Sequence, residues 1–164
     1  MHPSPQPALP DSHDILSKAQ QHLARAEHML TQTYRLLKDE KLFIPTLEHI
    51  ANATEGAMDA FLYSDARYKQ IPPVRTSFRD RMLLFRRYCL ALHKIKKEDA
   101  DLIEELHGLV RKHRECPMEF SRKSNLVLCS DDYDLDIISE ERLRSYLQRA
   151  KIFIREATIP LVKN

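Results

Sequence analysis

Reactive side chains are concentrated between His107 and Arg122, and their types suit chemistry on a phosphate. The cluster comprises His107, Arg111, Lys112, His113, Arg114, Glu115, Cys116, Glu119 and Arg122. An imidazole can act as a general base or acid because its ordinary pKa lies near neutrality. A guanidinium can hold a phosphate through two parallel hydrogen bonds. Together these groups are what cleavage of RNA through its 2′-hydroxyl would require.

Helical spacing divides this cluster between two faces of one predicted helix. His107, Arg111 and Arg114 share a face through i, i+4 and i+7 spacing. His113 instead extends the apolar stripe of that helix, which consists of Leu102, Leu106, Leu109 and Val110. The candidate catalytic residues are therefore His113, Arg111 and Arg114. The candidate binding residues are His107, Glu119 and Arg122.

Each of these residues also has a purely structural interpretation. A single histidine on an apolar stripe, such as His113, is usually a hydrogen-bonded core residue. Basic residues in the last turn of a helix usually stabilise the helix dipole. Glu119 and Arg122 could pair with each other and hold the loop that follows Pro117. The sequence leaves these alternatives open.

The spacing of histidines and cysteines gives no support to metal or thiol chemistry. There is no HExxH motif, His22 and His28 do not share a helix face, and His49 has no acidic partner one turn later. Nothing beside Cys116 would orient an activating base. The three cysteines, Cys89, Cys116 and Cys129, lack metal-ligand spacing. We expect no metal and no cofactor, and reduced thiols in a cytoplasmic protein.

Five amphipathic helices are predicted to position these residues. Their expected ranges are about 12–38, 44–63, 77–95, 98–115 and 139–160. Ser77 and Asp80 match a capping pattern at the start of the third helix, and Ser139 is expected to cap the fifth. Pro160 is expected to end that last helix. The third helix is apolar on two sides, which indicates a central place in a bundle or a dimer interface.

The region between the fourth and fifth helices has no helical period. Residues 125–129 could form a short extended piece, and an acidic loop is expected over 130–138, with Asp131 and Asp132 in a solvated turn. The predicted fold class is accordingly all-α, an antiparallel up-and-down bundle of about five helices. The predicted domains are a disordered proline-rich N-terminus over 1–11, which is not a secretion signal, and a single helical bundle over 12–160.

Composition excludes several other classes of protein. The chain has 164 residues, of which 43% are hydrophobic and 30% charged, as is typical of one soluble domain. Its two glycines cannot build a glycine-rich phosphate loop or the turns of a many-stranded sandwich. No apolar run approaches the roughly 20 residues of a membrane span. P-loop, Rossmann, sandwich and membrane-spanning folds are thereby excluded.

Charge is segregated along the chain although the net charge is only +2. Residues 75–97 carry eight basic residues and one acidic residue, whereas residues 98–105 carry five acidic residues and residues 130–141 carry six. Neighbouring segments of opposite charge most often neutralise each other on adjacent helices. A basic face that binds a polyanion is the alternative, and its affinity would fall steeply with salt.

Several segments of the chain resemble HEPN domains, the helical domains named for higher eukaryotes and prokaryotes nucleotide-binding. The first two predicted helices carry the likeness in Ala19–Leu30, Phe43–Ala53 and Ala57–Phe61. The later segment His113–Arg122, followed by Asp131–Tyr133 and a final helix, resembles uncharacterised archaeal-type HEPN-like proteins. The resemblance covers about residues 12–158. It implies a bundle of four or five helices that often forms a homodimer.

The same resemblance implies two possible functions. The resemblance implies that the chain could be a metal-independent endoribonuclease of a toxin–antitoxin or defence system, as many HEPN proteins are, in which an arginine precedes the catalytic histidine by about four to six positions, one to nearly two helical turns. This chain departs from that motif, since Arg111 lies only two positions before His113 and follows His107 instead of preceding it. We therefore expect a protein that acts by binding itself, an antitoxin-like partner protein, or a nucleotide or RNA. The alternative is a metal-independent endoribonuclease that uses His113 with Arg111 or Arg114.

Overall fold

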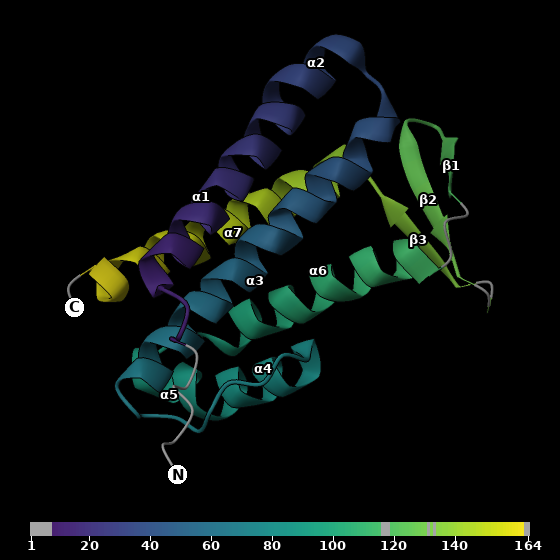
Figure 1. Cartoon of the computed structure of the whole chain (residues 1–164). Coiled ribbons are helices and arrows are strands. Elements are labelled where there is room, and N and C mark those ends of the chain that lie inside the picture. Colours follow the sequence, from purple (N-terminus) through teal and green to yellow (C-terminus); the bar gives the residue numbers. More distant parts are fainter. Residues whose placement is uncertain (1–7, 116–118, 131, 133, 163–164) are drawn as a thin grey trace.

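Helices form most of this chain, and one small sheet closes one end of it (Figure 1). A computed structural model describes residues 8–115, 119–130, 132 and 134–162. In chain order, the elements are α1 (Ser12–His28), a π-helical segment (Met29–Thr33), α2 (Tyr34–Leu37), a short 3₁₀ turn (Glu40–Leu42), α3 (Phe43–Arg67), α4 (Phe78–Leu84), a second π-helical segment (Phe85–Cys89), α5 (Leu90–His93), α6 (Lys97–Glu115), β1 (Glu119–Arg122), β2 (Asn125–Cys129), β3 (Leu135–Ile138) and α7 (Glu140–Val162).

The helices begin where the sequence predicts, because capping side chains satisfy their first backbone amides. The Asp11 carboxylate accepts a hydrogen bond from the His13 amide at 3.0 Å, ahead of α1. The Ser77 hydroxyl accepts one from the Asp80 amide at 3.1 Å, ahead of α4. The Ser139 hydroxyl accepts one from the Arg142 amide at 3.0 Å, ahead of α7. The predicted starts of the first, third and fifth helices are thus confirmed.

Two of the predicted helices contain a π-helical turn, and the turn changes which side chains face inward. α4, the π segment and α5 form one continuous rod that ends where Lys94 adopts φ 54°. Met82, Phe85, Cys89 and Leu92 recur at the spacing of one α-helical stripe, and the first three are buried, but Leu92 is 49% exposed. A π turn holds more residues than an α turn, so every later residue is rotated around the axis. His93 consequently takes the inward position that Leu92 would have in an unbroken α-helix.

The three strands form an antiparallel sheet in the order β1-β2-β3. Lys123 and Ser124 link β1 to β2 with φ values of 50° and 63°, which is the backbone of a tight two-residue hairpin turn. The extended piece predicted at 125–129 is confirmed as β2. The acidic loop predicted over 130–138 is wrong for residues 135–138, because β3 pairs there with β2. The predicted turn at Asp131 lies outside the described residues.

The prediction that the last helix ends at Pro160 is wrong, because α7 continues to Val162. Proline lacks a backbone N–H and therefore removes one helical hydrogen bond. Only two described residues follow Pro160 in α7, so little regular structure depends on that bond. The side chain of Leu161 also remains 3% exposed, which favours the helical path of the chain.

The hydrophobic core lies along α3 and is divided between two clusters. One cluster joins the first halves of α3 and α7 to the second half of α6 and to the sheet, through residues such as Leu47, Leu106 and Leu128. The other joins the opposite ends of these helices to the α4–α5 rod, through residues such as Phe61 and Phe85. α1 and α6 both pack on α3, one on each side (Figure 1). The strip of α3 between them is where a groove forms.

Candidate functional site

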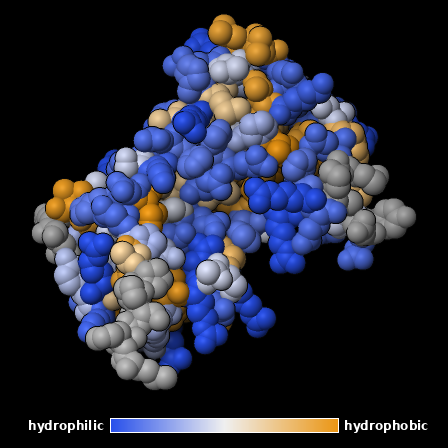
Figure 2. Space-filling model, in the orientation of Figure 1, coloured by the Kyte–Doolittle hydropathy of each residue, from blue (hydrophilic) through white to orange (hydrophobic). Residues whose placement is uncertain are grey.

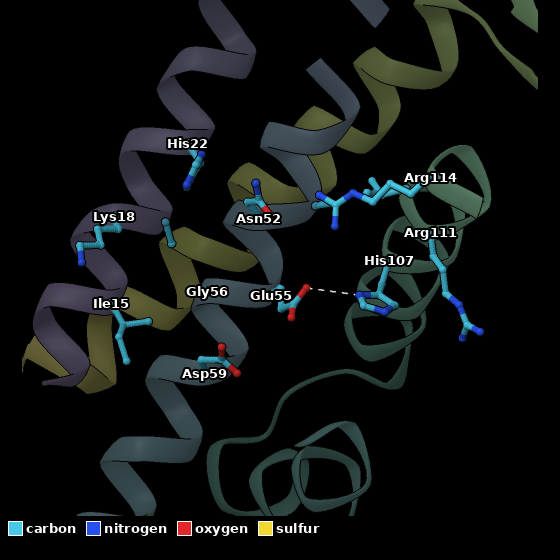
Figure 3. Close-up of a pocket in the computed structure, with 13 residues that line it drawn as sticks. Ile15, Lys18, His22, Asn52, Glu55, Gly56, Asp59, His107, Arg111 and Arg114 are labelled. Carbon is cyan, nitrogen blue, oxygen red and sulfur yellow. Dashed lines mark hydrogen bonds and ion pairs between the residues drawn. The ribbon is translucent and has the colours of Figure 1, made fainter. Parts of the chain in front are cut away.

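A groove of about 590 Å³ runs over α3, with α1 as one wall and α6 as the other (Figure 3). α3 is buried on most of its surface, and Asn52, Glu55 and Asp59 form a polar stripe along the side that remains open. α1 contributes Lys18 and His22. α6 contributes His107, Val110, Arg111 and Arg114. The groove thus combines basic walls with a partly acidic floor.

The helices α1 and α3 can form one edge of this groove because small residues let them approach closely. A Cβ atom added to Gly56 would lie 3.0 Å from the Cβ of Ala19. Such a distance is shorter than ordinary van der Waals contact between carbon atoms. Gly56 is therefore where the two backbones meet, and both residues line the bottom of the groove.

His107 lies on the α6 wall, where neighbours on two other helices fix the orientation of its ring. Its Nδ1 lies 3.4 Å from Oε2 of Glu55 on α3. Its ring stacks on Phe78 of α4, with 3.5 Å between the ring centroids and an interplanar angle of 2°. The imidazole is about a third exposed, so it remains accessible from the groove. An imidazole held by a carboxylate in this way has the arrangement that a general base needs.

The floor of the groove is neutralised in part by Arg81, which reaches it from α4. Arg81 Nη1 lies 2.5 Å from Oδ1 of Asp59, and Nη2 lies 2.7 Å from Oε1 of Glu55. Burial raises the pKa of Asp59, although the Arg81 guanidinium acts in the opposite direction. Burial also opposes the charge on Arg81, but the two carboxylates outweigh it and raise the pKa of the guanidinium. Arg81 Nε is buried without a hydrogen-bond partner among the described residues.

The cations of the groove differ in how free they are to bind a ligand. Arg111 is 68% exposed, and its Nε donates a hydrogen bond to Glu115 at 2.7 Å. Arg114 extends from α6 toward Asn52, whereas Arg111 points away from α3 (Figure 3). Lys18 lies on the opposite wall, with its amine turned away from α6 in this view. Within the described part of the chain, neither Lys18 nor Arg114 is seen in an ion pair, so both charges remain available to an anion.

A pair of histidines joins the α1 wall to α3. Nδ1 of His22 lies 2.9 Å from Nδ1 of His49, so one nitrogen must donate its proton and the other accept it. Burial lowers the pKa of both imidazoles, and the positive charge of Arg25 acts in the same direction. His22 faces the groove, while His49 lies beside a second hollow that Arg25 and His28 also line. This pair holds at most one proton between the two Nδ1 atoms.

The predicted site residues are divided between the groove and the sheet. His107, Arg111 and Arg114 share the groove face of α6, as their spacing predicts. His113 does not line the groove and faces β1, where its Nδ1 lies 3.5 Å from Oε2 of Glu119. That nitrogen has no hydrogen-bond partner among the described residues. His113 and the set of His107, Arg111 and Arg114 therefore lie on different faces of α6.

Arg122 lies apart from both of these groups. It is the last residue of β1, beside the turn at Lys123 and Ser124, and it is exposed. In the sheet, its cross-strand partner is Asn125. The described residues show no ion pair between Arg122 and Glu119. The pairing considered from sequence is thus not seen there.

The site predicted from the sequence lacks the residues that α1 and α3 contribute to the groove. Asn52, Glu55 and Asp59 recur at helical spacing on a helix that is otherwise largely apolar, and that pattern was a usable signal. Lys18 and His22 also stand one turn apart on the polar face of α1. Their convergence on the groove depends on how the helices pack.

Several segments of opposite charge neutralise each other, as their order in the chain predicts. Arg86 on the α4–α5 rod pairs with Asp101 at 2.8 Å and with Glu104 at 2.5 Å on α6. Lys112 pairs with Asp136 of β3 at 2.6 Å. These contacts, together with those of Arg81, account for part of the basic segment 75–97 and of both acidic segments. The exposed Arg87 belongs to the remainder of the basic segment.

A buried polar cluster lies away from the groove, where the α4–α5 rod packs on the end of α3. His93 Nε2 lies 2.9 Å from both carboxylate oxygens of Asp65, and the Cys89 thiol lies 3.2 Å from Oδ2 of Asp65. Burial and the nearby carboxylate raise the pKa of Cys89 far above its ordinary value. A thiol in this state is inert as a nucleophile, and the cluster has the features of a structural link.

No family model matches the chain, and no curated protein matches it. Among the helices that the structure describes, none has the length and apolar character needed to cross a membrane. The described residues contain no group of three or more potential ligands placed to hold a metal ion.

Proposed function

We propose that this protein is a HEPN-like helical bundle that acts by binding a phosphate-bearing ligand, a nucleotide or RNA, in the groove between α1, α3 and α6. The observation that carries the proposal is the presence of Lys18 and Arg114 on opposite walls, with Arg111 beside them. Cations that approach one space from two helices can hold a phosphate from both sides. The antiparallel up-and-down arrangement and the HEPN likeness are part of the same proposal.

The volume and the floor of the groove agree with a ligand of this size and chemistry. A volume of about 590 Å³ lies within the range of small-molecule sites in proteins. The amide of Asn52 and the carboxylate of Glu55 offer hydrogen-bond acceptors to ribose hydroxyls or to an amino group of a base. The phosphate would contact Arg114, the flexible Lys18 side chain would turn toward it from the opposite wall, and the nucleoside would lie along α3.

Calorimetric titration with AMP, ATP and a short single-stranded uridine RNA tests the proposal. We expect Lys18→Ala and Arg114→Ala each to weaken binding by about tenfold, since a hydrogen bond to a charged group contributes roughly 1.5 kcal/mol or more. Arg87→Ala is the matched control, because Arg87 belongs to the basic segment 75–97 but lies outside the groove. Its affinity should equal that of the wild type.

Two results would contradict this proposal. One is a wild-type protein that binds none of the three probes at millimolar concentration. The other is a loss of binding in Arg87→Ala with none in Arg114→Ala, because the basic segment of the third predicted helix would then be the binding face.

Endoribonuclease activity is the second candidate, and the position of His107 favours it. The sequence indicated His113 as the catalytic histidine, with Arg111 or Arg114. His107, however, is the histidine that shares the groove with both arginines and that lies beside a carboxylate, Glu55. In this version, His107 would take the proton from a 2′-hydroxyl, whose oxygen then bonds to the phosphorus as the bond from phosphorus to the 5′-oxygen breaks. The departing 5′-oxygen would take up a proton from water, while Arg114 holds the phosphate.

Incubation of single-stranded RNA with the protein in EDTA tests this second candidate. Cleavage that is lost in His107→Ala and retained in His113→Ala would support an enzyme that works in the groove. Cleavage lost only in His113→Ala would favour the arrangement predicted from sequence. If the RNA stays intact in the presence of wild-type protein, the enzyme candidate is rejected and binding remains the proposed function.

A further inference from the structure

The outer strand β1 presents a free and partly apolar edge. β1 is bonded to β2 on one side, and within the described residues no strand pairs with its other side. All four of its residues are exposed, including Phe120 at 50%. Natural edge strands are often short or carry charged side chains, proline or a bulge that hinders further pairing. β1 is short, but it has no proline or bulge, and its two charged residues, Glu119 and Arg122, stand at its ends.

The hairpin turn determines which backbone groups point away from β2. In a hairpin with a two-residue turn, the two residues that flank the turn form a hydrogen-bonded pair, here Arg122 and Asn125. Hydrogen-bonded pairs alternate along the ladder, so Phe120 bonds to Val127. The N–H and C=O groups of Glu119 and Ser121 therefore point outward from the sheet edge.

The side chains on the outer face of the sheet form an apolar row that runs up to this edge. Phe120, Val127 and Ile137 are cross-strand neighbours on β1, β2 and β3. Val127 is covered by its neighbours, whereas Phe120 and Ile137 are each about half exposed. Leu135, 55% exposed, extends the row along β3. On the opposite face, Leu126, Leu128 and Ile138 pack into the core.

We propose that β1 pairs antiparallel with β1 of a second copy of this chain, which joins the two sheets into one sheet of six strands. A two-fold axis at Phe120 places Glu119 opposite Ser121 of the second copy, and their outward backbone groups form four hydrogen bonds. The two Phe120 rings then lie side by side on the outer face, where cross-strand aromatic pairs are favourable.

The chemistry of the strand favours a second copy as the occupant of this edge. In this register, Arg122 of each copy lies diagonally across from Phe120 of the other, within reach for a cation–π contact. The apolar row also becomes continuous from Ile137 of one copy to Ile137 of the other. A strand of unrelated sequence would not provide these matches.

One contact inside the subunit prepares the edge for this pairing. Glu119 Oε2 lies 3.5 Å from His113 Nδ1, so the start of β1 lies against α6. A strand that is already extended loses less conformational entropy when it pairs. The interface is nevertheless smaller than the ~1,600 Å² typical of stable complexes, so the dimer should depend on concentration.

Sedimentation velocity of the full chain, from about 5 µM to about 500 µM, tests the proposal. We expect the wild type to shift from monomer to dimer across this range. Ser121→Pro should remain monomeric, because proline removes an outward N–H without removing a bond to β2. Ser121→Ala is its matched control and should still dimerise, since only backbone groups pair there. Phe120→Lys should also remain monomeric.

A further variant separates this interface from the one that the third predicted helix suggests. Leu83→Ser changes an exposed apolar residue of α4, which is 58% exposed, and should leave dimerisation unchanged. A wild type that is monomeric at the highest concentration would overturn the proposal. So would dimers of both Ser121→Pro and Phe120→Lys, or a Leu83→Ser protein that is monomeric while Ser121→Pro dimerises. Circular dichroism shows whether each variant remains folded.

Discussion

Arg81 and Asp59 form the tightest contact on the floor of the groove, with Nη1 of the guanidinium at 2.5 Å from one carboxylate oxygen and 2.6 Å from the other. The Arg81 side chain is 13% exposed and that of Asp59 is 22% exposed. The pair links α4 to α3 beneath the space where a ligand would lie. Because Glu55 shares the same guanidinium, one cation holds two carboxylates in place.

Replacing Arg81 with methionine should destabilise the protein by about 2–4 kcal/mol near neutral pH, because two partly buried carboxylates lose their cation. The loss should shrink on acidification, because burial raises the pKa of Asp59 and a protonated carboxyl no longer needs a cation. Urea denaturation at neutral and acidic pH measures it. Arg86→Met is a control, since Arg86 pairs with more exposed carboxylates and should cost less. Equal losses for the two variants would contradict the prediction.

The two glycines should respond in opposite ways to a larger side chain. Gly108 has no atom within 4 Å of an added Cβ, so Gly108→Ala should stabilise the protein by about 0.5–1 kcal/mol through helix propensity. Gly56→Val should destabilise it by roughly 1–3 kcal/mol, because the added atoms press against Ala19 on α1. Thermal unfolding of the two variants measures these changes. A stabilising Gly56→Val would show that α1 and α3 do not meet at that position.

Stability should fall as the pH drops below about 6.5, in part because of His22 and His49. Burial lowers the pKa of both groups in the folded state, so the unfolded chain binds more protons in this window. The two histidines therefore contribute fully to the free energy of unfolding above the pKa that they have in the unfolded chain. This contribution is lost as the pH falls through their lower pKa in the folded state. His49→Gln should flatten this part of the pH profile by up to ~1 kcal/mol, and unfolding midpoints between pH 5.5 and 7.5 measure it. His28→Gln is the control, and an unchanged slope in His49→Gln would refute the prediction.

Cys89 should not react with iodoacetamide until the protein unfolds. It is fully buried, and both burial and Asp65 raise the pKa of its thiol. Cys129 is only partly buried and should be modified first. Peptide mapping by mass spectrometry after timed labelling, with and without urea, distinguishes the two sites. Labelling of Cys89 at the rate of Cys129 in native protein would indicate that the α4–α5 rod opens readily.

Local sequence patterns are enough to predict which segments become helices and where most of them begin. Apolar residues recur at helical spacing, and Asp11, Ser77 and Ser139 cap the segments that follow them. These signals act between residues a few positions apart, so they are visible in one dimension. The shared face of His107, Arg111 and Arg114 was predictable for the same reason.

The packing of the helices selects which of these residues lie together in a site. His113 and Arg111 are two positions apart, and packing of α6 between α3 and the sheet sends them to different surfaces. Lys18 joins the groove only because α1 crosses α3 closely at Gly56. β3 likewise depends on pairing with β2, and the inward position of His93 depends on a π turn. Such contacts join residues far apart in the chain, and no local periodicity encodes them.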